Sequence, residues 1–198
     1  GTWTDGEEIR VFGAKRALVN GSGQPSSKTL AYAYGTQFAQ TIQPGGAYEF
    51  VNFNFQGEEG TETMYGVNGV DNAFEFDGTN YTEIRTGIAT DTPNHIEAYK
   101  NHLFVSYTNG SIVNSGLQLP TIFSTTMGSA EIIVGDSVTG MSVESKDALA
   151  VFGRNNTYVL YGTSKDDWNL TTFYTGSGAV DGTVEKMQTT IFLDDRGL

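Results

Sequence analysis

One short design recurs four times along this chain: an apolar segment, a polar turn and a second apolar segment. The copies cover residues 64–76, 103–113, 148–161 and 190–198. Their turn positions are Gly69, Gly110, Asn156 and Gly197, which gives intervals of 41, 46 and 41 residues. Such a period is typical of one four-stranded blade of a β-propeller. Because a unit of this kind buries its apolar face only against a neighbour, the repeat predicts an array of stacked units.

The last copy is shorter than the others. Residues 190–198 contain one apolar segment, its turn and a single residue of the return segment. Propellers have four to eight blades, and three and a half hairpins do not close such a ring. We therefore expect the chain to be an incomplete segment of a longer propeller.

Composition favours an all-β fold. The chain has 25 Gly and 4 Pro among 198 residues, and its apolar residues, 38% of the total, come in short runs between turn residues. None of these runs approaches the roughly 20 apolar residues of a membrane-spanning helix. The absence of Cys excludes disulfides and thiol chemistry. These features predict antiparallel hairpins arranged as blades.

The formal net charge is −12, from 23 acidic and 11 basic residues that are spread along the chain. A dispersed charge of this kind is typical of a solvated surface. Proteins that grip nucleic acid need clustered Lys and Arg, and Lys15–Arg16 is the only adjacent basic pair. The charge therefore argues against a DNA- or RNA-binding protein.

The chain divides into two parts by pattern. Residues 1–46 predict an N-terminal β segment, with a hairpin over residues 8–19 that turns near Gly13 and a Gly/Ser-rich loop over residues 20–28. Residues 47–198 contain the repeats at 41–46 residue spacing. Within them, residues 48–55 predict a half-buried strand because Val51, Phe53 and Phe55 alternate with asparagines.

The turns have a chemistry of their own. Asn-Gly and Asp-Gly pairs between apolar strands are a strong hairpin signal because both residues accept a positive φ. In the third repeat an Asn-Asn pair stands in the same place, since Asn tolerates this conformation at some cost. The residues predicted to form structural turns are Asn68, Gly69, Asp77, Gly78, Asn109, Gly110, Asn155, Asn156 and Gly197.

No pattern of catalytic residues is present. His95 and His102 lie seven residues apart without carboxylates at a metal-ligand spacing, and Trp168 is expected to be a packing residue, as is Trp3. Neighbouring carboxylates such as Asp166–Asp167 point to opposite faces of a strand, so they do not form the facing pair of a glycosidase. The sequence predicts no enzyme activity, no catalytic or metal-binding residue and no cofactor.

Several segments carry a family resemblance. They are residues 64–78, residues 100–104 with Ser115–Gly116, residues 150–162 and residues 192–198. Together they resemble virion structural proteins of tailed bacteriophages, over roughly residues 50–198. The similarity includes propeller-type tail proteins, such as the nozzle or hub proteins that form rings at the distal end of short tails.

The resemblance implies a mechanical function in the phage tail of the virion. It implies a ring-shaped homo-oligomer that contacts other phage tail proteins and contributes to tail assembly and to the DNA ejection channel. DNA would then be a non-specific cargo rather than a bound ligand. We add the hypothesis that acidic residues face the channel, because negative charge repels the phosphate backbone.

Two other functions stay open. One is a carbohydrate- or receptor-binding β domain, suggested by the aromatic residues Tyr81, Tyr99, Tyr107 and Trp168. If these side chains lie together in one groove, they favour this function. If they are distributed among the cores, they favour a structural role. A glycoside-hydrolase-type propeller is a lesser alternative, for which the chain offers carboxylates without a recognisable pair.

Overall fold

The structure is a computed structural model that describes residues 8–11, 14–18, 42–145 and 147–197. The chain forms two compact units, Gly1–Thr41 and Ile42–Leu198. In the first unit, β1 (Glu8–Val11) and β2 (Ala14–Leu18) pair antiparallel, which confirms the predicted hairpin. Its predicted turn residue Gly13, the loop over residues 20–28 and Trp3 lie outside the described residues. The predicted division at residues 46/47 falls just inside the second unit.

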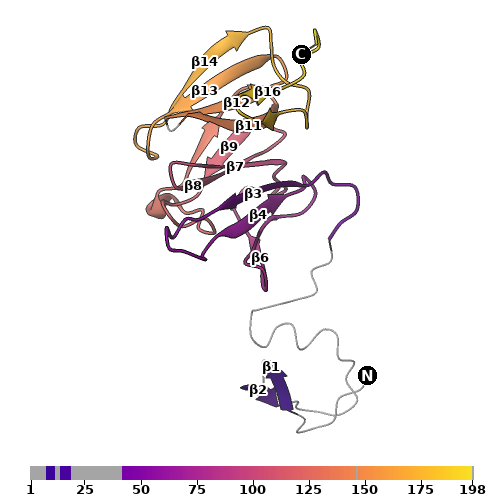
Figure 1. Cartoon of the computed structure of the whole chain (residues 1–198), viewed down its shortest axis with the longest axis vertical. Helices are drawn as coiled ribbons and strands as arrows, with labels where there is room; N and C mark the ends of the chain where they lie inside the picture. Colours follow the sequence, from indigo (N-terminus) through magenta and orange to yellow (C-terminus); the bar gives the residue numbers. More distant parts are fainter. Residues whose placement is uncertain (1–7, 12–13, 19–41, 146, 198) are drawn as a thin grey trace. The chain divides into compact units, whose positions relative to one another are not determined.

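The second unit is all-β, as predicted, and contains three four-stranded antiparallel sheets in succession (Figure 1). The strands of the first sheet are β3 (Glu49–Phe53), β4 (Thr63–Val67), β5 (Ala73–Phe76) and β6 (Tyr81–Ile84). Those of the second are β7 (His95–Tyr99), β8 (His102–Ser106), β9 (Ser111–Asn114) and β10 (Ala130–Ile133). Those of the third are β11 (Val138–Ser145), β12 (Ala148–Gly153), β13 (Asn156–Tyr161) and β14 (Asn169–Thr175).

Each of these sheets is a meander in which consecutive strands are neighbours. A fourth sheet follows, a pair formed by β15 (Glu185–Lys186) and β16 (Thr190–Ile191). Among the described residues, the one helical segment is the single 3₁₀ turn η1 (Thr125–Met127) before β10. In the same part of the chain, no helix has the length and apolar character needed to cross a membrane.

The first three sequence repeats correspond to the second and third strands of the four-stranded sheets. Residues 64–76 cover β4 from its second residue and all of β5, residues 103–113 cover most of β8 and β9, and residues 148–161 match β12 and β13. The last copy, from residue 190, begins with β16. The repeated turn therefore occupies the same place in the three four-stranded sheets, and the sequence pattern identified the central hairpin of each of them.

The strand predicted before the first repeat is confirmed as β3. Its residues alternate between half-buried and exposed positions, starting with half-buried Glu49. Val51 and Phe53 pack against the core between the first and second sheets, and Phe55 is a buried member of that core. The exposed residues Phe50 and Asn52 belong to the opposite face, as a period of two requires.

The sheets pack face to face in chain order. One core cluster joins the first sheet to the second and includes Tyr65, Ile84 and Leu103. Another joins the second sheet to the third and includes Phe104, Leu149 and Leu160. The second sheet thus presents one face to the first sheet and the other to the third. This arrangement buries apolar side chains that no single hairpin could cover.

The first strands of successive sheets lie side by side. β3 contacts β7, and β7 contacts β11. The fourth sheet continues this order, since Lys186 on β15 is close to Glu144 on β11 and Thr190 on β16 bonds Ser142. The four-stranded sheets therefore diverge from a common line formed by their first strands, as Figure 1 shows for β3, β7 and β11.

Candidate functional site

The predicted turn residues lie between strands or at a strand end. Asn68 and Gly69 connect β4 to β5, Asn109 and Gly110 connect β8 to β9, and Asp77 and Gly78 connect β5 to β6. Asn155 and Asn156 lie where β12 passes into β13, and Gly197 closes a turn after β16. The glycines have φ of +77° (Gly69), +91° (Gly78), +83° (Gly110) and +119° (Gly197). Glycine is favoured there because it has no Cβ to clash in the left-handed region.

In each Asn-Gly or Asp-Gly turn, one residue has a positive φ. Among the described residues, Asn68, Asp77 and Asn109 do not have it; only the glycine of each pair does. The connections are longer than two residues, so one left-handed residue is enough. The preceding side chain caps the turn instead: Asn68 Oδ1 accepts the N–H of Asp71 at 2.8 Å, and Asp77 Oδ1 accepts that of Asn80 at 2.6 Å.

The turn with two positive φ values is one that the sequence pattern missed. Lys100 (φ +51°) and Asn101 (φ +57°) are the two residues between β7 and β8. A two-residue hairpin loop of type I′ has this conformation at both positions, because its twist then matches that of the strands. Asn101 was the available signal, but no glycine follows it.

Asn155 and Asn156 do not have positive φ, and a carboxylate holds their turn. Asp136, in the connection between β10 and β11, accepts the N–H of Asn155 at 3.0 Å and the Nδ2 of Asn156 at 3.3 Å. A Cβ at Gly153 would lie 2.6 Å from Asp136 Oδ2, so the missing side chain makes room for this contact. The turn is thus fixed by a residue 19 positions earlier in the chain.

Charged residues gather along the neighbouring first strands. We call this set the first-strand cluster: Glu49 on β3, His95 and Glu97 on β7, Glu144 on β11 and Lys186 on β15. Its centre is His95, whose side chain is 4% exposed. His95 Nδ1 lies 2.8 Å from Glu49 Oε2, and Glu49 Oε1 accepts the backbone N–H of Ile96 at 3.1 Å. One carboxylate therefore ties the first sheet to the second.

The cluster extends to the later strands. His95 Nε2 lies 3.1 Å from Asp181 Oδ1, without the alignment of a hydrogen bond. Lys186 Nζ donates to Glu144 Oε2 at 3.4 Å, which links β15 to β11. Glu97 accepts the N–H of Ala98 at 2.9 Å. Burial raises the pKa of Glu97 above the ordinary value, while the N–H groups of Ala98 and Val143 act in the opposite direction.

His95 and His102 are both buried and contact neighbouring groups of the sheets. His102 Nδ1 lies 2.6 Å from the carbonyl oxygen of Ser115, and its ring packs edge-on against Trp168 and Phe104. No group of three or more His, Cys, Asp or Glu side chains within the described residues could hold a metal ion. Each imidazole is thus bound to groups that position it within the sheets.

The four aromatic residues considered for carbohydrate binding do not gather in one groove; Tyr99 and Trp168 share one core, with ring centroids 6.0 Å apart. Tyr99 and Tyr107 are buried on opposite sides of the second sheet, at 2% and 4% exposure. Trp168 packs against the core between the second and third sheets and donates its indole N–H to Asn114 Oδ1 at 3.1 Å. Tyr81 stacks on Phe74 in the first sheet. These side chains do not share a groove.

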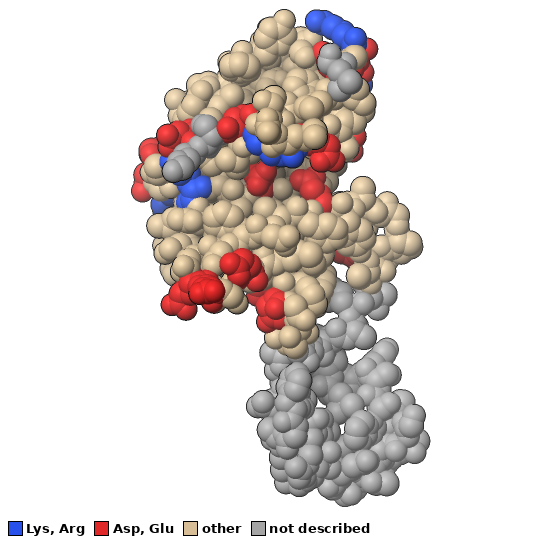
Figure 2. All heavy atoms as spheres, in the orientation of Figure 1, with Lys and Arg blue, Asp and Glu red and all other residues tan. Residues whose placement is uncertain are grey.

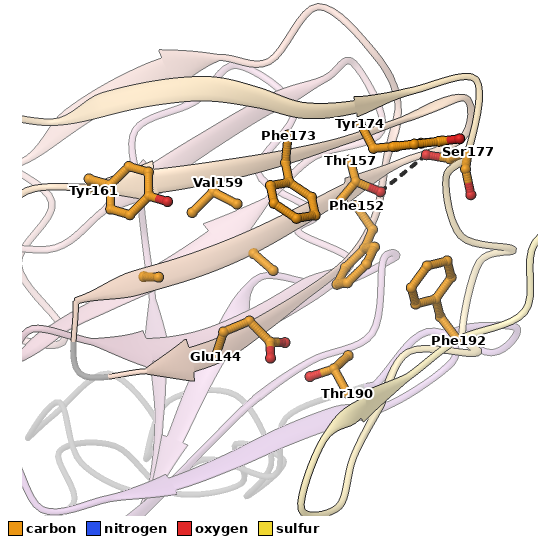
Figure 3. A pocket seen from close by; sticks show the side chains of 12 residues that line it. Glu144, Phe152, Thr157, Val159, Tyr161, Phe173, Tyr174, Ser177, Thr190 and Phe192 are labelled. Carbon is orange, nitrogen blue, oxygen red and sulfur yellow. Dashed lines mark hydrogen bonds between the residues drawn. The ribbon is translucent and has the colours of Figure 1, made fainter.

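A different set of aromatic residues does surround a groove of about 580 Å³ (Figure 3). It lies on the face of the third sheet that points away from the second sheet, beside the fourth sheet. Hydroxyls and one carboxylate, that of Glu144, border it, and Thr157 Oγ1 donates to the carbonyl oxygen of Ser177 at 3.1 Å. The apolar residues that define the groove are Phe152, Val159, Tyr161, Phe173, Tyr174 and Phe192.

The first sheet also has an aromatic outer face. Phe50 and Phe74 meet edge-on, with ring centroids 6.2 Å apart, above Gly66. A Cβ at Gly66 would lie 2.5 Å from Phe74 Cζ, so glycine leaves space for both rings. Tyr48 extends this row by stacking on Phe50, and both are about half exposed. The stack of sheets thus ends in aromatic side chains on both sides.

Comparisons of the chain with protein-family models, with curated proteins and with solved structures give no match.

Proposed function

We propose that this chain is a segment of a β-propeller that acts as a structural ring component, of the kind that joins parts of a bacteriophage tail. The observation that carries this proposal is the position of the first strands. β3, β7 and β11 lie side by side while their sheets diverge. In a propeller, the first strands of successive blades surround the central channel.

The size of the units supports the same arrangement. Three consecutive four-stranded meanders stack face to face, and the first strand of a fourth sheet joins their row. The starts of β3, β7, β11 and β15 follow one another at similar intervals along the chain. We propose that more blades complete the ring in the whole protein, since a propeller needs four to eight of them.

The acidic residues of the first strands support the proposal that DNA passes through the channel. Glu49, Glu97 and Glu144 each belong to a different contact between neighbouring first strands, and basic residues are fewer throughout the chain. Figure 2 shows other acidic side chains in separate groups over the surface. Acidic residues therefore occur both outside and along the proposed channel. A negative channel would let DNA slide because it repels the phosphates.

Location on the virion tests this proposal most directly. A small epitope tag inserted in the exposed turn beside Gly78 is to be detected by gold-labelled antibody on intact phage particles in the electron microscope. We expect gold at the tail tip. If no gold is found on the particles and the tagged protein is free in the lysate, the chain has no role in the virion.

A further inference from the structure

His95 lies between two carboxylates that belong to different parts of the second unit. On one side, its Nδ1 is 2.8 Å from Glu49 Oε2, on β3 of the first sheet. On the other side, its Nε2 is 3.1 Å from Asp181 Oδ1, in the connection between β14 and β15. The His95 side chain is 4% exposed, and its Nε2 atom is buried. One imidazole ring therefore contacts both the first sheet and the segment that leads to the fourth.

The protonation state of the ring decides how many of these contacts it can make. A neutral imidazole has one N–H donor and one lone pair, whereas an imidazolium ion has a donor at both nitrogens. In the neutral ring, one nitrogen of His95 would direct its lone pair at a carboxylate oxygen. That contact is repulsive, and the burial of the ring keeps water from relieving it. Two flanking carboxylates thus fit the imidazolium ion.

The two carboxylates are held to different degrees. The second oxygen of Glu49 accepts the backbone N–H of Ile96 at 3.1 Å, so Glu49 stays bound to β7 without the ring. Asp181 is 73% exposed and can be hydrated instead. It lies in a turn in which Thr183 donates its backbone N–H to the carbonyl oxygen of Val180 at 3.2 Å. Loss of the ring proton therefore acts on this turn rather than on β3.

The other ionisable groups around β7 are engaged with different partners. Glu97, two residues along the strand from His95, accepts the N–H of Ala98. The ionisable residues on the further strands that pack on β7 are Tyr65 on β4, which bonds Glu75, His102 on β8, which contacts Ser115, and Glu144 on β11, which bonds Lys186. Glu49 and Asp181 are thus the carboxylates that flank the ring.

We infer that His95 is a proton-dependent clasp between the first two sheets and the turn that leads to the fourth sheet. In the imidazolium form, the ring holds Glu49 and Asp181 at the same time. Loss of the proton ends the attraction to Asp181, and the turn over residues 180–183 opens while Glu49 stays in place. All of these contacts lie within the second unit, so the clasp does not depend on the proposed ring.

Amide hydrogen exchange in the whole chain measures the opening of the turn. Exchange over residues 180–186 is followed at about pH 5 and about pH 8, the range in which histidines change charge, and is corrected for the intrinsic effect of pH on exchange. We expect the protection of this segment to fall by about threefold or more between the two pH values, because the contact is partly screened by solvent.

Two variants make the measurement specific to the clasp. Asp181→Ala removes the carboxylate that the proton holds, so residues 180–186 should have the lower protection at both pH values. Because Asp181 is exposed, this variant should keep the fold. Asp166→Ala is the matched control, since Asp166 is an exposed aspartate in the connection between β13 and β14. It should show the same pH response as the unchanged chain.

Two results would overturn the inference. Equal protection of residues 180–186 at both pH values in the unchanged chain would mean that the His95 proton does not hold the turn. A pH response that persists in Asp181→Ala would assign the response to another group, such as Glu97. Neither result bears on the proposed ring, which the location of the protein on the virion tests separately.

Discussion

At the residue scale, the most informative feature is the burial of charged groups along the first strands. Glu49 and His95 are 46 residues apart in the sequence and meet only because the first and second sheets stack. No local pattern reveals such a pair, and its members could not have been predicted together. The turn glycines are the opposite case, because their φ values depend on local geometry.

We predict that Glu49 and His95 stabilise the fold as a pair. Replacing either with Ala leaves the other without its partner, so each single variant should lower the free energy of unfolding by about 1–3 kcal/mol. A double-mutant cycle measured by chemical denaturation tests this. The double variant should lose less free energy of unfolding than the two single variants lose together, with a coupling energy of at least about 0.5 kcal/mol. The control is the pair Glu83–Arg85, whose arginine side chain is 75% exposed, with an expected coupling under about 0.5 kcal/mol. Equal couplings would contradict the structural role of the Glu49–His95 pair.

Glu97 gives a prediction about pH. Its folded-state pKa is raised by burial, so the ionised carboxylate opposes folding at neutral pH, and this cost disappears as the pH falls through the raised pKa. Glu97→Gln should therefore increase the free energy of unfolding at pH 7. The gain over the unchanged chain should shrink toward pH 4, as followed by urea denaturation at a series of pH values.

The exposed Glu59→Gln variant serves as the control for Glu97. It should show no comparable gain at pH 7. If Glu97→Gln is less stable than the unchanged chain at pH 7, then the carboxylate contributes favourable contacts that exceed its burial cost, and the account of Glu97 is wrong.

At the scale of elements, the sequence predicted the central hairpins better than the outer strands. β12 and β13 coincide with the predicted repeat because both are apolar and a polar turn separates them. β14 is exposed along most of its length and carries hydroxyl residues, so its sequence resembles a loop. β7 was not recognised because it begins with His95 and contains Glu97, which bind groups in other sheets. Contacts between sheets, rather than local preference, define these strands.

The register of β13 can be tested at two adjacent positions. Leu160 is fully buried in the core between the second and third sheets, whereas Tyr161 is 45% exposed beside the groove. Leu160→Ala should destabilise the fold by about 2–5 kcal/mol because it opens a cavity. Tyr161→Ala should cost less than about 1 kcal/mol. Thermal unfolding followed by circular dichroism can compare them, and a reversed order would mean that the register is shifted by one residue.

At the scale of the whole molecule, stacked sheets account for both the repeat and the charge distribution. Repeated apolar hairpins pack face to face, which brings the first strands together and places their carboxylates in one row. The interval between repeats predicted this stacking. It could not predict the groove, because the groove depends on the width of the fourth sheet relative to the third.

The row of carboxylates predicts weak interaction with DNA in the assembled protein. Reversing two first-strand charges, Glu144→Lys with Glu185→Lys, should cause retention of duplex DNA that weakens as salt increases. The matched control is Glu58→Lys with Glu59→Lys, which changes the net charge equally in the exposed connection between β3 and β4. Gel-shift titrations at two salt concentrations compare the pairs. Equal retention by both would mean that net charge, rather than the first strands, governs the interaction.

Electron cryo-microscopy of the whole protein tests the central claim, that successive sheets are blades around a shared channel. The account predicts a closed ring in which β3, β7, β11 and β15 face a central channel and the first-strand cluster lies along its wall. A map in which these strands lie at the outer edge of the particle, or in which the sheets stack without enclosing a channel, would contradict the account.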